Sequence, residues 1–132
     1  MSGETELNTL IRSMKAELVE GLFVFVTLSD RSIPDGLTPK MCFQETEGTT
    51  LIMLKTEAEE YGLPYEFPCR MITLNIHSAL EAVGFIARIA TELADHSMGV
   101  NPVAGFYHDH LFVPDGRETD ALAVLDELAA SV

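Results

Sequence analysis

The sequence predicts an α+β protein in which antiparallel sheets are covered by helices and the elements repeat in two halves. Pairs of apolar runs, separated by short loops with glycine or aspartate, are typical of β-hairpins. Amphipathic helix patterns alternate with these pairs. Element order therefore predicts a diverged tandem repeat, with residues 1–66 as the N-terminal half and residues 67–132 as the C-terminal half.

The composition is that of a globular protein. Hydrophobic residues make up 47% of the 132 residues and charged residues 22%, and no apolar run approaches the ~18 residues that a membrane span needs. The formal net charge of −13 repels phosphate backbones and anionic lipid. We therefore expect no nucleic-acid and no membrane partner, whereas a zwitterion such as an amino acid is not repelled.

Two features predict a cytoplasmic location. The acidic residues 1–6 lack the basic and apolar regions of a secretory signal. Cys42 and Cys69 form no C-x-x-C motif and have no metal-type spacing, which favours two reduced thiols.

The N-terminal half begins with an amphipathic pattern over residues 7–18, which predicts a helix that ends at Gly21. The continuous apolar run 22–28 predicts a strand that is buried on both faces. Breaker residues predict a surface loop over residues 29–40.

A hairpin is predicted next, from residues 41–46 and 49–55 around a short loop with glycine. Thr56 and Glu59 form a capping-box pattern, which predicts a short helix. The prolines of residues 64–68 exclude that segment from a helix or a central strand.

The C-terminal half turns from a strand over residues 70–77 into a predicted helix over residues 78–96. Ser78 and Glu81 have the spacing of a capping box that fixes this corner. The N–H groups of such a first turn can hold a ligand carboxylate, or they can simply bind water. A second hairpin, from residues 99–108 and 111–114, and a final helix after residues 115–118 complete the half.

Two segments of this half, Ile72-Thr73-Leu74-Asn75-Ile76-His77-Ser78-Ala79-Leu80-Glu81-Ala82-Val83-Gly84 and Val103-Ala104-Gly105-Phe106-Tyr107-His108-Asp109-His110-Leu111-Phe112-Val113, carry a family resemblance. They resemble the ACT domains of a small bacterial family of uncharacterised tandem ACT-like proteins, as do residues 7–14 and 47–51. The resemblance implies a ferredoxin-like fold and kinship with the regulatory ACT domains of aspartate kinases. Such domains commonly bind free amino acids at a subunit or repeat interface, which implies an amino-acid ligand and a homodimer here.

The resemblance also implies which residues form the ligand site. The loop between strand and helix contributes His77, Ser78, Ala79, Leu80, Glu81 and Gly84, and the facing strand contributes Ala104, Gly105, Phe106, His108 and Asp109. In this hypothesis the corner holds the ligand carboxylate and Asp109 holds the ammonium group, while Phe106 and Met98 line the side-chain pocket. Two alternatives stay open: Asp109 as a turn residue and Phe106 as a core residue.

Other functions compete with amino-acid binding. His108 and His110, at i and i+2, could share Zn²⁺ or Ni²⁺, with His77 or a carboxylate completing the set. A ligand-free interaction or scaffold module is a further alternative. No nucleophile elbow, phosphate loop or glycine triplet occurs, so we expect neither an enzyme nor a cofactor.

Overall fold

The computed structural model describes residues 6–132, so most of the acidic stretch 1–6 lies outside the described residues. The chain divides into two compact units. Unit 1 contains the described part of residues 1–20 together with residues 70–132, and unit 2 contains residues 21–69. The predicted boundary at residue 66 concerns the sequence repeat and stays a prediction.

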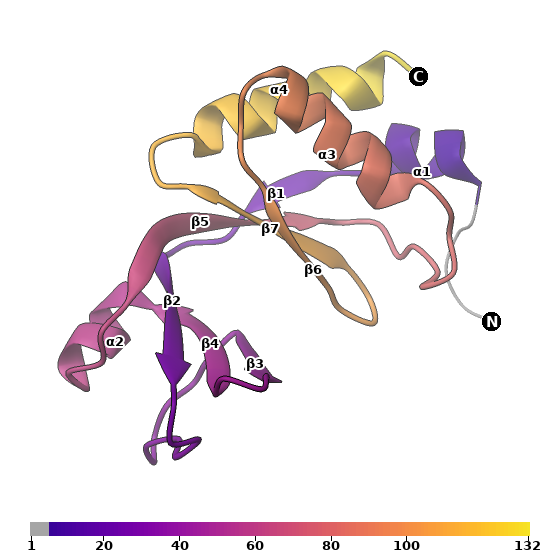
Figure 1. The fold of residues 1–132 in the computed structure, drawn as a ribbon. Coiled ribbons are helices and arrows are strands. Elements are labelled where there is room, and N and C mark those ends of the chain that lie inside the picture. Colours follow the sequence, from indigo (N-terminus) through magenta and orange to yellow (C-terminus); the bar gives the residue numbers. More distant parts are fainter. Residues whose placement is uncertain (1–5) are drawn as a thin grey trace. The chain divides into compact units, whose positions relative to one another are not determined.

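Unit 1 is a four-stranded antiparallel sheet with three helices. Its elements are α1 (Leu7–Ser13), β1 (Ala16–Leu18), residues 70–74 of β5 (Glu66–Leu74), α3 (Phe85–Asp95), β6 (Asn101–Ala104), β7 (Asp109–Pro114) and α4 (Glu118–Ala130). The strand order is β1-β5-β7-β6. Figure 1 shows α1, α3 and α4 on one side of these strands.

The core of unit 1 lies between that sheet and its helices. α3 places residues four apart on one apolar face, and Phe85, Ile89 and Leu93 are all buried. The strands contribute alternate residues, such as Leu111 and Val113 of β7, to the same cluster. This cluster holds α3 and α4 against the sheet and so positions the loops at their ends.

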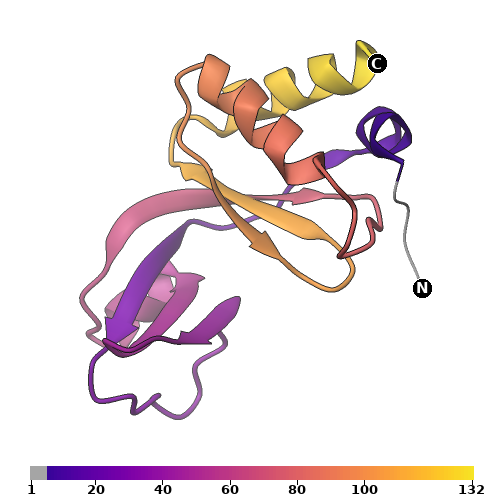
Figure 2. The same ribbon diagram turned by 45° about the vertical axis from the view of Figure 1, so that its right-hand side comes forward.

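Unit 2 has the same strand arrangement with fewer helices. Its elements are β2 (Phe23–Leu28), β3 (Met41–Gln44), β4 (Thr49–Leu54), α2 (Lys55–Glu60) and residues 66–69 of β5. The strands of unit 2, drawn as a ribbon in Figure 2, have the order β5-β2-β4-β3. β2 pairs with β4 from Phe23↔Leu54 to Leu28↔Thr49. A smaller apolar cluster, which includes Val26 and Ala58, lies under α2.

Both units have the ferredoxin-like order, in which the fourth strand lies beside the first and the third beside the second. In unit 2 this order runs along the chain from β2 to β5, and the loop 29–40 stands where a first helix would be. In unit 1 the order begins at β5, and its fourth strand, β1, comes from the N-terminal segment. The ferredoxin-like class, the strand within 22–28, both hairpins and the final helix are confirmed. The predicted burial of that strand on both faces is wrong, because Phe25 is half-buried and Thr27 is exposed.

The prediction of one long helix over residues 7–18 is wrong. α1 ends at Ser13, and Met14 has an extended backbone (ψ 138°). Residues 16–18 form β1 instead, with Ala16 opposite Leu74. Residues 16–18 form a strand despite their helical pattern because their main-chain groups can hydrogen-bond to β5. In a longer helix the same groups would have bonded within the helix.

The capping box at the start of the predicted helix 78–96 is also wrong. α3 begins at Phe85, seven residues later than predicted, and its N-cap is Gly84 in a left-handed conformation (φ 91°) without a side-chain hydrogen bond. The Ser78 hydroxyl is engaged elsewhere, by Asp109. Residues 75–84 therefore form a loop, which we call the 75–84 loop.

Two predictions in unit 2 fail as well. The N-cap of α2 is Leu54, with no side-chain cap, so Thr56 does not form a capping box. Pro68 lies inside β5, although the prolines had excluded residues 64–68 from a strand. The strand accommodates it at a bulge, where Phe67 has φ 58° and β2 shifts register between Phe23 and Phe25.

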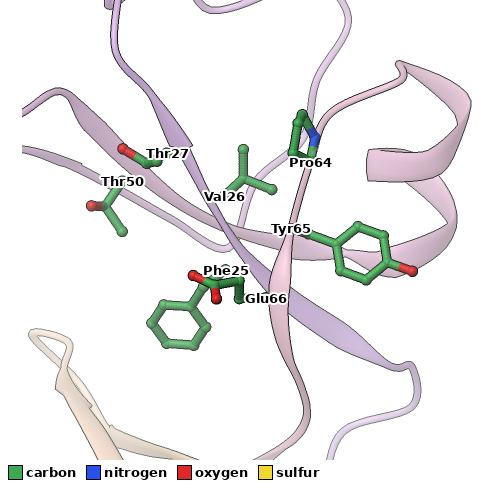
Figure 3. Close-up of a pocket in the computed structure, with 7 residues that line it drawn as sticks. All are labelled: Phe25, Val26, Thr27, Thr50, Pro64, Tyr65 and Glu66. Carbon is green, nitrogen blue, oxygen red and sulfur yellow. The ribbon is translucent and has the colours of Figure 1, made fainter.

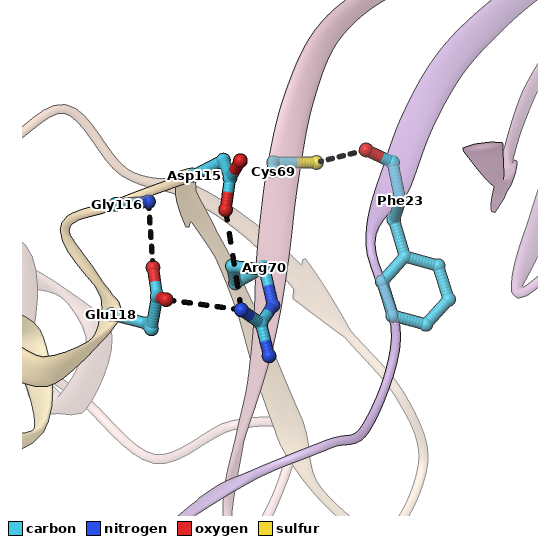
Figure 4. Close-up of polar contacts among 6 residues, drawn as sticks. All are labelled: Phe23, Cys69, Arg70, Asp115, Gly116 and Glu118. Carbon is cyan, nitrogen blue, oxygen red and sulfur yellow. Dashed lines mark hydrogen bonds and ion pairs between the residues drawn. The ribbon is translucent and has the colours of Figure 1, made fainter.

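Polar contacts fix the two portions of β5 within their own units (Figure 4). In unit 2 the Cys69 thiol donates to the main-chain oxygen of Phe23 at 3.4 Å. In unit 1 Arg70 Nη1 lies 3.0 Å from Glu118 Oε2, and the second oxygen of Glu118 accepts from the Gly116 N–H at 2.7 Å. Glu118 thus links the start of α4 to the sheet.

Candidate functional site

The 75–84 loop meets the hairpin between β6 and β7 in unit 1. Ser78 Oγ donates to Asp109 Oδ2 at 3.3 Å, which joins the two predicted halves of the site. The β6–β7 turn, residues 105–108, is closed by the Gly105 N–H donating to the His108 oxygen at 2.9 Å. A Cβ on Gly105 would lie 3.0 Å from that oxygen, so the turn favours a residue without a side chain.

Asp109 is the titratable group with a shifted pKa in this region. Burial raises the pKa of the Asp109 carboxyl above its ordinary value, while the Ser78 hydrogen bond and the neighbouring His110 and His108 act in the opposite direction. The half-buried Asp109 carboxylate accepts a hydrogen bond from a neutral hydroxyl and has capacity to accept another from a cationic donor.

Aromatic rings surround the tip of the hairpin. The His77 ring centroid lies 5.4 Å from that of Tyr107 and 6.1 Å from that of Phe106, and the two hairpin rings are 5.0 Å apart. Phe106 is 60% exposed, so the alternative that it is a core residue is wrong. Met98, expected in the same pocket, is instead part of the buried core of unit 1.

Among the remaining predicted residues, Ala104 lies directly opposite Asp109 in the pairing of β6 with β7. Ala79 is buried, Leu80 is 67% exposed, Glu81 and Ala104 are exposed, and Gly84 begins α3. Because α3 starts at Phe85, the N–H groups free of helical partners are those that follow Gly84, not those that follow Ser78. Whether the eleven predicted residues form a ligand site stays a prediction.

The histidine pair that suggested a metal site lies beside Asp109. The ring centroids of His108 and His110 are 6.4 Å apart, and His110 Nδ1 hydrogen-bonds to Thr73 Oγ1 at 3.0 Å. His108 Nδ1 is buried and has no hydrogen-bond partner among residues 6–132. In that described part of the chain, no three His, Cys, Asp or Glu side chains are placed to share a metal ion.

The structure also shows a cavity that sequence reasoning missed (Figure 3). It lies in unit 2, has a volume of about 450 Å³ and is lined by Phe25, Val26, Thr27, Thr50, Pro64, Tyr65 and Glu66. Its existence depends on where β5 begins to pair with β2, which no periodicity in the sequence reveals. Pro64 was the available signal, because a residue without an N–H group interrupts strand pairing.

The helices of the described residues include none with the length and apolar character to cross a bilayer. The fold defines a class of protein, a pair of ferredoxin-like units, and a polar contact joins the strand-to-helix loop of unit 1 to its hairpin.

Sequence comparison gives this class a family. The ACT domain family matches residues 2–70 and again residues 66–127, so the chain belongs to the ACT domain family as a tandem pair. ACT domains are regulatory, non-catalytic modules, which supports a regulatory role for this chain. No curated protein matches the sequence.

Solved structures share the fold of this chain. A Vibrio cholerae protein of unknown function, a possible transport protein, is 40% identical, with a TM-score of 0.84 over 97% of this chain and 99% of that one. An Agrobacterium tumefaciens protein is 16% identical, with a TM-score of 0.75 over 88% and 89%. The ligand-free regulatory subunit of aspartate kinase from Thermus thermophilus is 11% identical, with a TM-score of 0.67 over 89% and 97%, and it shares the fold.

Proposed function

We propose that this regulatory ACT protein binds a free amino acid between the 75–84 loop and the β6–β7 hairpin of unit 1. The proposal rests on the half-buried Asp109 carboxylate, which lies where the two segments meet. Asp109 accepts a hydrogen bond from the Ser78 hydroxyl at 3.3 Å. An ammonium group is the complementary partner, because it is a charged donor and forms a stronger hydrogen bond than a neutral one.

The ligand carboxylate has a candidate partner at the start of α3. The first helical bond of α3 runs from the Arg88 N–H to the Gly84 oxygen, which leaves the N–H groups of residues 85–87 outside the helical ladder. A helix N-terminus attracts anions through these groups and its partial positive charge. We therefore propose that the ligand carboxylate binds at the N–H groups after Gly84, and not at those after Ser78 as expected from the sequence.

We further propose that the protein acts as a homodimer, and that ligand occupancy is transmitted through the dimer interface. Large apolar side chains are exposed on the same two segments: Leu80 at 67%, Val83 at 83%, Phe106 at 60% and Tyr107 at 65%. Exposed apolar residues grouped in this way favour a protein partner, and a second copy would cover them.

A cytoplasmic location belongs to the same proposal. Cys42 is an exposed thiol, and Cys69 is a buried thiol that donates to the Phe23 oxygen. Cysteines kept as thiols are usual in a reducing compartment.

The experiment is a thermal-shift screen of the full chain with each of the twenty free amino acids at millimolar concentration. A ligand at one hundred times its Kd stabilises the folded state by about 2.7 kcal/mol, which raises Tm by several degrees. We expect at least one amino acid to do so. Asp109→Asn should abolish the shift, and Asp126→Asn, which removes an exposed charge of α4, should preserve it.

Two outcomes would contradict the proposal: no shift with any amino acid, or an equal shift in the Asp109 variant. Stabilisation by Zn²⁺ or Ni²⁺ that is lost in His108→Ala and His110→Ala, without any amino-acid response, would favour the metal alternative instead.

A further inference from the structure

The cavity of unit 2 lies where strand pairing along β2 stops. Lys55 N–H donates to the Leu22 oxygen at the end of the β2–β4 ladder, so the even-numbered residues of β2 direct their main-chain groups toward β4. The odd-numbered residues direct theirs toward β5, where Phe23 pairs with Cys69 and Phe25 with Glu66. Thr27 is the next odd-numbered residue of β2, and the pairing of β2 with β5 ends before Thr27.

The segment opposite Thr27 cannot continue the ladder. β5 begins at Glu66, and Pro64, which lines the cavity with Thr27, has no N–H group to donate. The main-chain N–H and C=O of Thr27 therefore face the cavity edge, beside the apolar side chain of Phe25. A volume of about 450 Å³ is in the size range of pockets that hold small molecules.

The charge of the lining is negative. Glu66 is exposed at the cavity, and its carboxylate forms no hydrogen bond or ion pair with the described residues. No lysine or arginine is among the lining residues. Lys55, which lies 5.8 Å above the Tyr65 ring, is paired with Glu59 at 3.2 Å. Combined with the net charge of −13, this lining favours a cationic ligand.

We propose that this cavity is a second binding site, which takes a small primary amine with an apolar body. The ammonium group pairs with the Glu66 carboxylate, and the apolar body lies against Phe25 and Pro64, two of the lining residues drawn in Figure 3. The Thr27 main chain supplies one further donor and acceptor at the edge of β2. The lining residues belong to unit 2, whereas Asp109 belongs to unit 1.

The test is a calorimetric titration of the full chain with phenethylamine, in parallel with ¹⁵N-resolved NMR. We expect a Kd below about 1 mM, a shifted Thr27 amide resonance, and no binding of 3-phenylpropionate, which has a similar body and the opposite charge. Glu66→Gln should weaken phenethylamine about tenfold, as expected for the loss of one charge-assisted hydrogen bond.

Matched variants separate this site from a general effect of charge. Glu60→Gln removes an exposed charge of α2 that does not line the cavity, and Asp109→Asn alters the proposed amino-acid site, so both should leave phenethylamine affinity unchanged. Absence of phenethylamine binding, equal binding of the carboxylate, equal weakening by Glu60→Gln, or resonance shifts that exclude Thr27 would each overturn the proposal. The NMR readout on the unaltered chain holds even if a variant fails to fold.

Discussion

Ser78 Oγ donates a hydrogen bond to Asp109 Oδ2 across 3.3 Å, and thereby joins a loop that precedes a helix to a hairpin 31 residues further along the chain. The sequence had given Ser78 a different role, as a helix cap for residues that turn out to form the 75–84 loop. The hydroxyl instead partly stabilises a carboxylate that burial disfavours.

The unfolding free energy of the Asp109→Asn variant, compared with that of the wild type, should increase as the pH rises. Burial raises the pKa of Asp109 in the folded state above its unfolded value, so folding favours the protonated carboxyl. The wild-type contribution is thus fully present at low pH and is lost as the pH rises through the raised pKa. Urea unfolding measures this at pH 4 and at pH 7. The unfolding free energy of the variant minus that of the wild type should be larger at pH 7 than at pH 4. A constant or decreasing difference would contradict burial as the dominant cause.

Gly84→Ala should destabilise unit 1 by about 1 kcal/mol, because the residue has φ 91° and alanine disfavours that conformation. The new Cβ would lie 3.5 Å from Leu7 Cδ2, an ordinary contact, so backbone strain and not crowding is the expected cause. Gly99→Ala is the matched control, since nothing lies within 4 Å of its Cβ position. Equal Tm values for the two variants would argue against Gly84 as the start of α3.

Arg70→Gln should cost about 1.5–3 kcal/mol of unfolding free energy, the range for a hydrogen bond to a charged group. Arg70 Nη1 lies 3.0 Å from Glu118, and both side chains are largely shielded, at 23% and 17% exposure. Arg88→Gln breaks a more exposed pair on α3, with Glu92, and should cost no more than about 0.5 kcal/mol. Denaturant titrations of both variants measure the difference, and equal losses would show that burial does not distinguish the pairs.

Phe106→Ser should convert a dimer to a monomer in sedimentation-velocity experiments, since it removes an apolar group that we propose lies in the interface. Phe43→Ser is the control, because Phe43 is 61% exposed on β3 of unit 2 and carries no such role. A wild-type protein that sediments as a monomer would contradict the dimer, and so would dimer loss with the Phe43 variant alone.

The sequence predicted element types where a segment's own pattern decides the outcome. The run 22–28 contains a strand, as its apolar and β-branched residues predict, although Thr27 on one face of that strand is exposed. Residues 16–18 followed a helical pattern, yet a distant partner, β5, makes them a strand. The periodicity of a short segment does not reveal that it will pair with a strand far away in the sequence.

The sequence predicted which two segments form the candidate site. It did not predict the roles of the individual residues in them. Asp109 and Ser78 were both among the predicted residues, because the family resemblance locates the loop and the hairpin. Their roles depended on where α3 begins, which rests on the left-handed Gly84 and not on a side-chain cap. The cavity of unit 2 left no periodic pattern, only the signal of Pro64, since the cavity arises where pairing between β2 and β5 ends.

The most direct test of amino-acid binding in unit 1 is an NMR titration of the ¹⁵N-labelled full chain with each free amino acid. Our account predicts that one or more amino acids shift the amide resonances of Ser78, Asp109 and residues 85–87 together, with saturation, while β3 of unit 2 stays unchanged. Titrations that shift none of these resonances, or that shift only residues of unit 2, would contradict it.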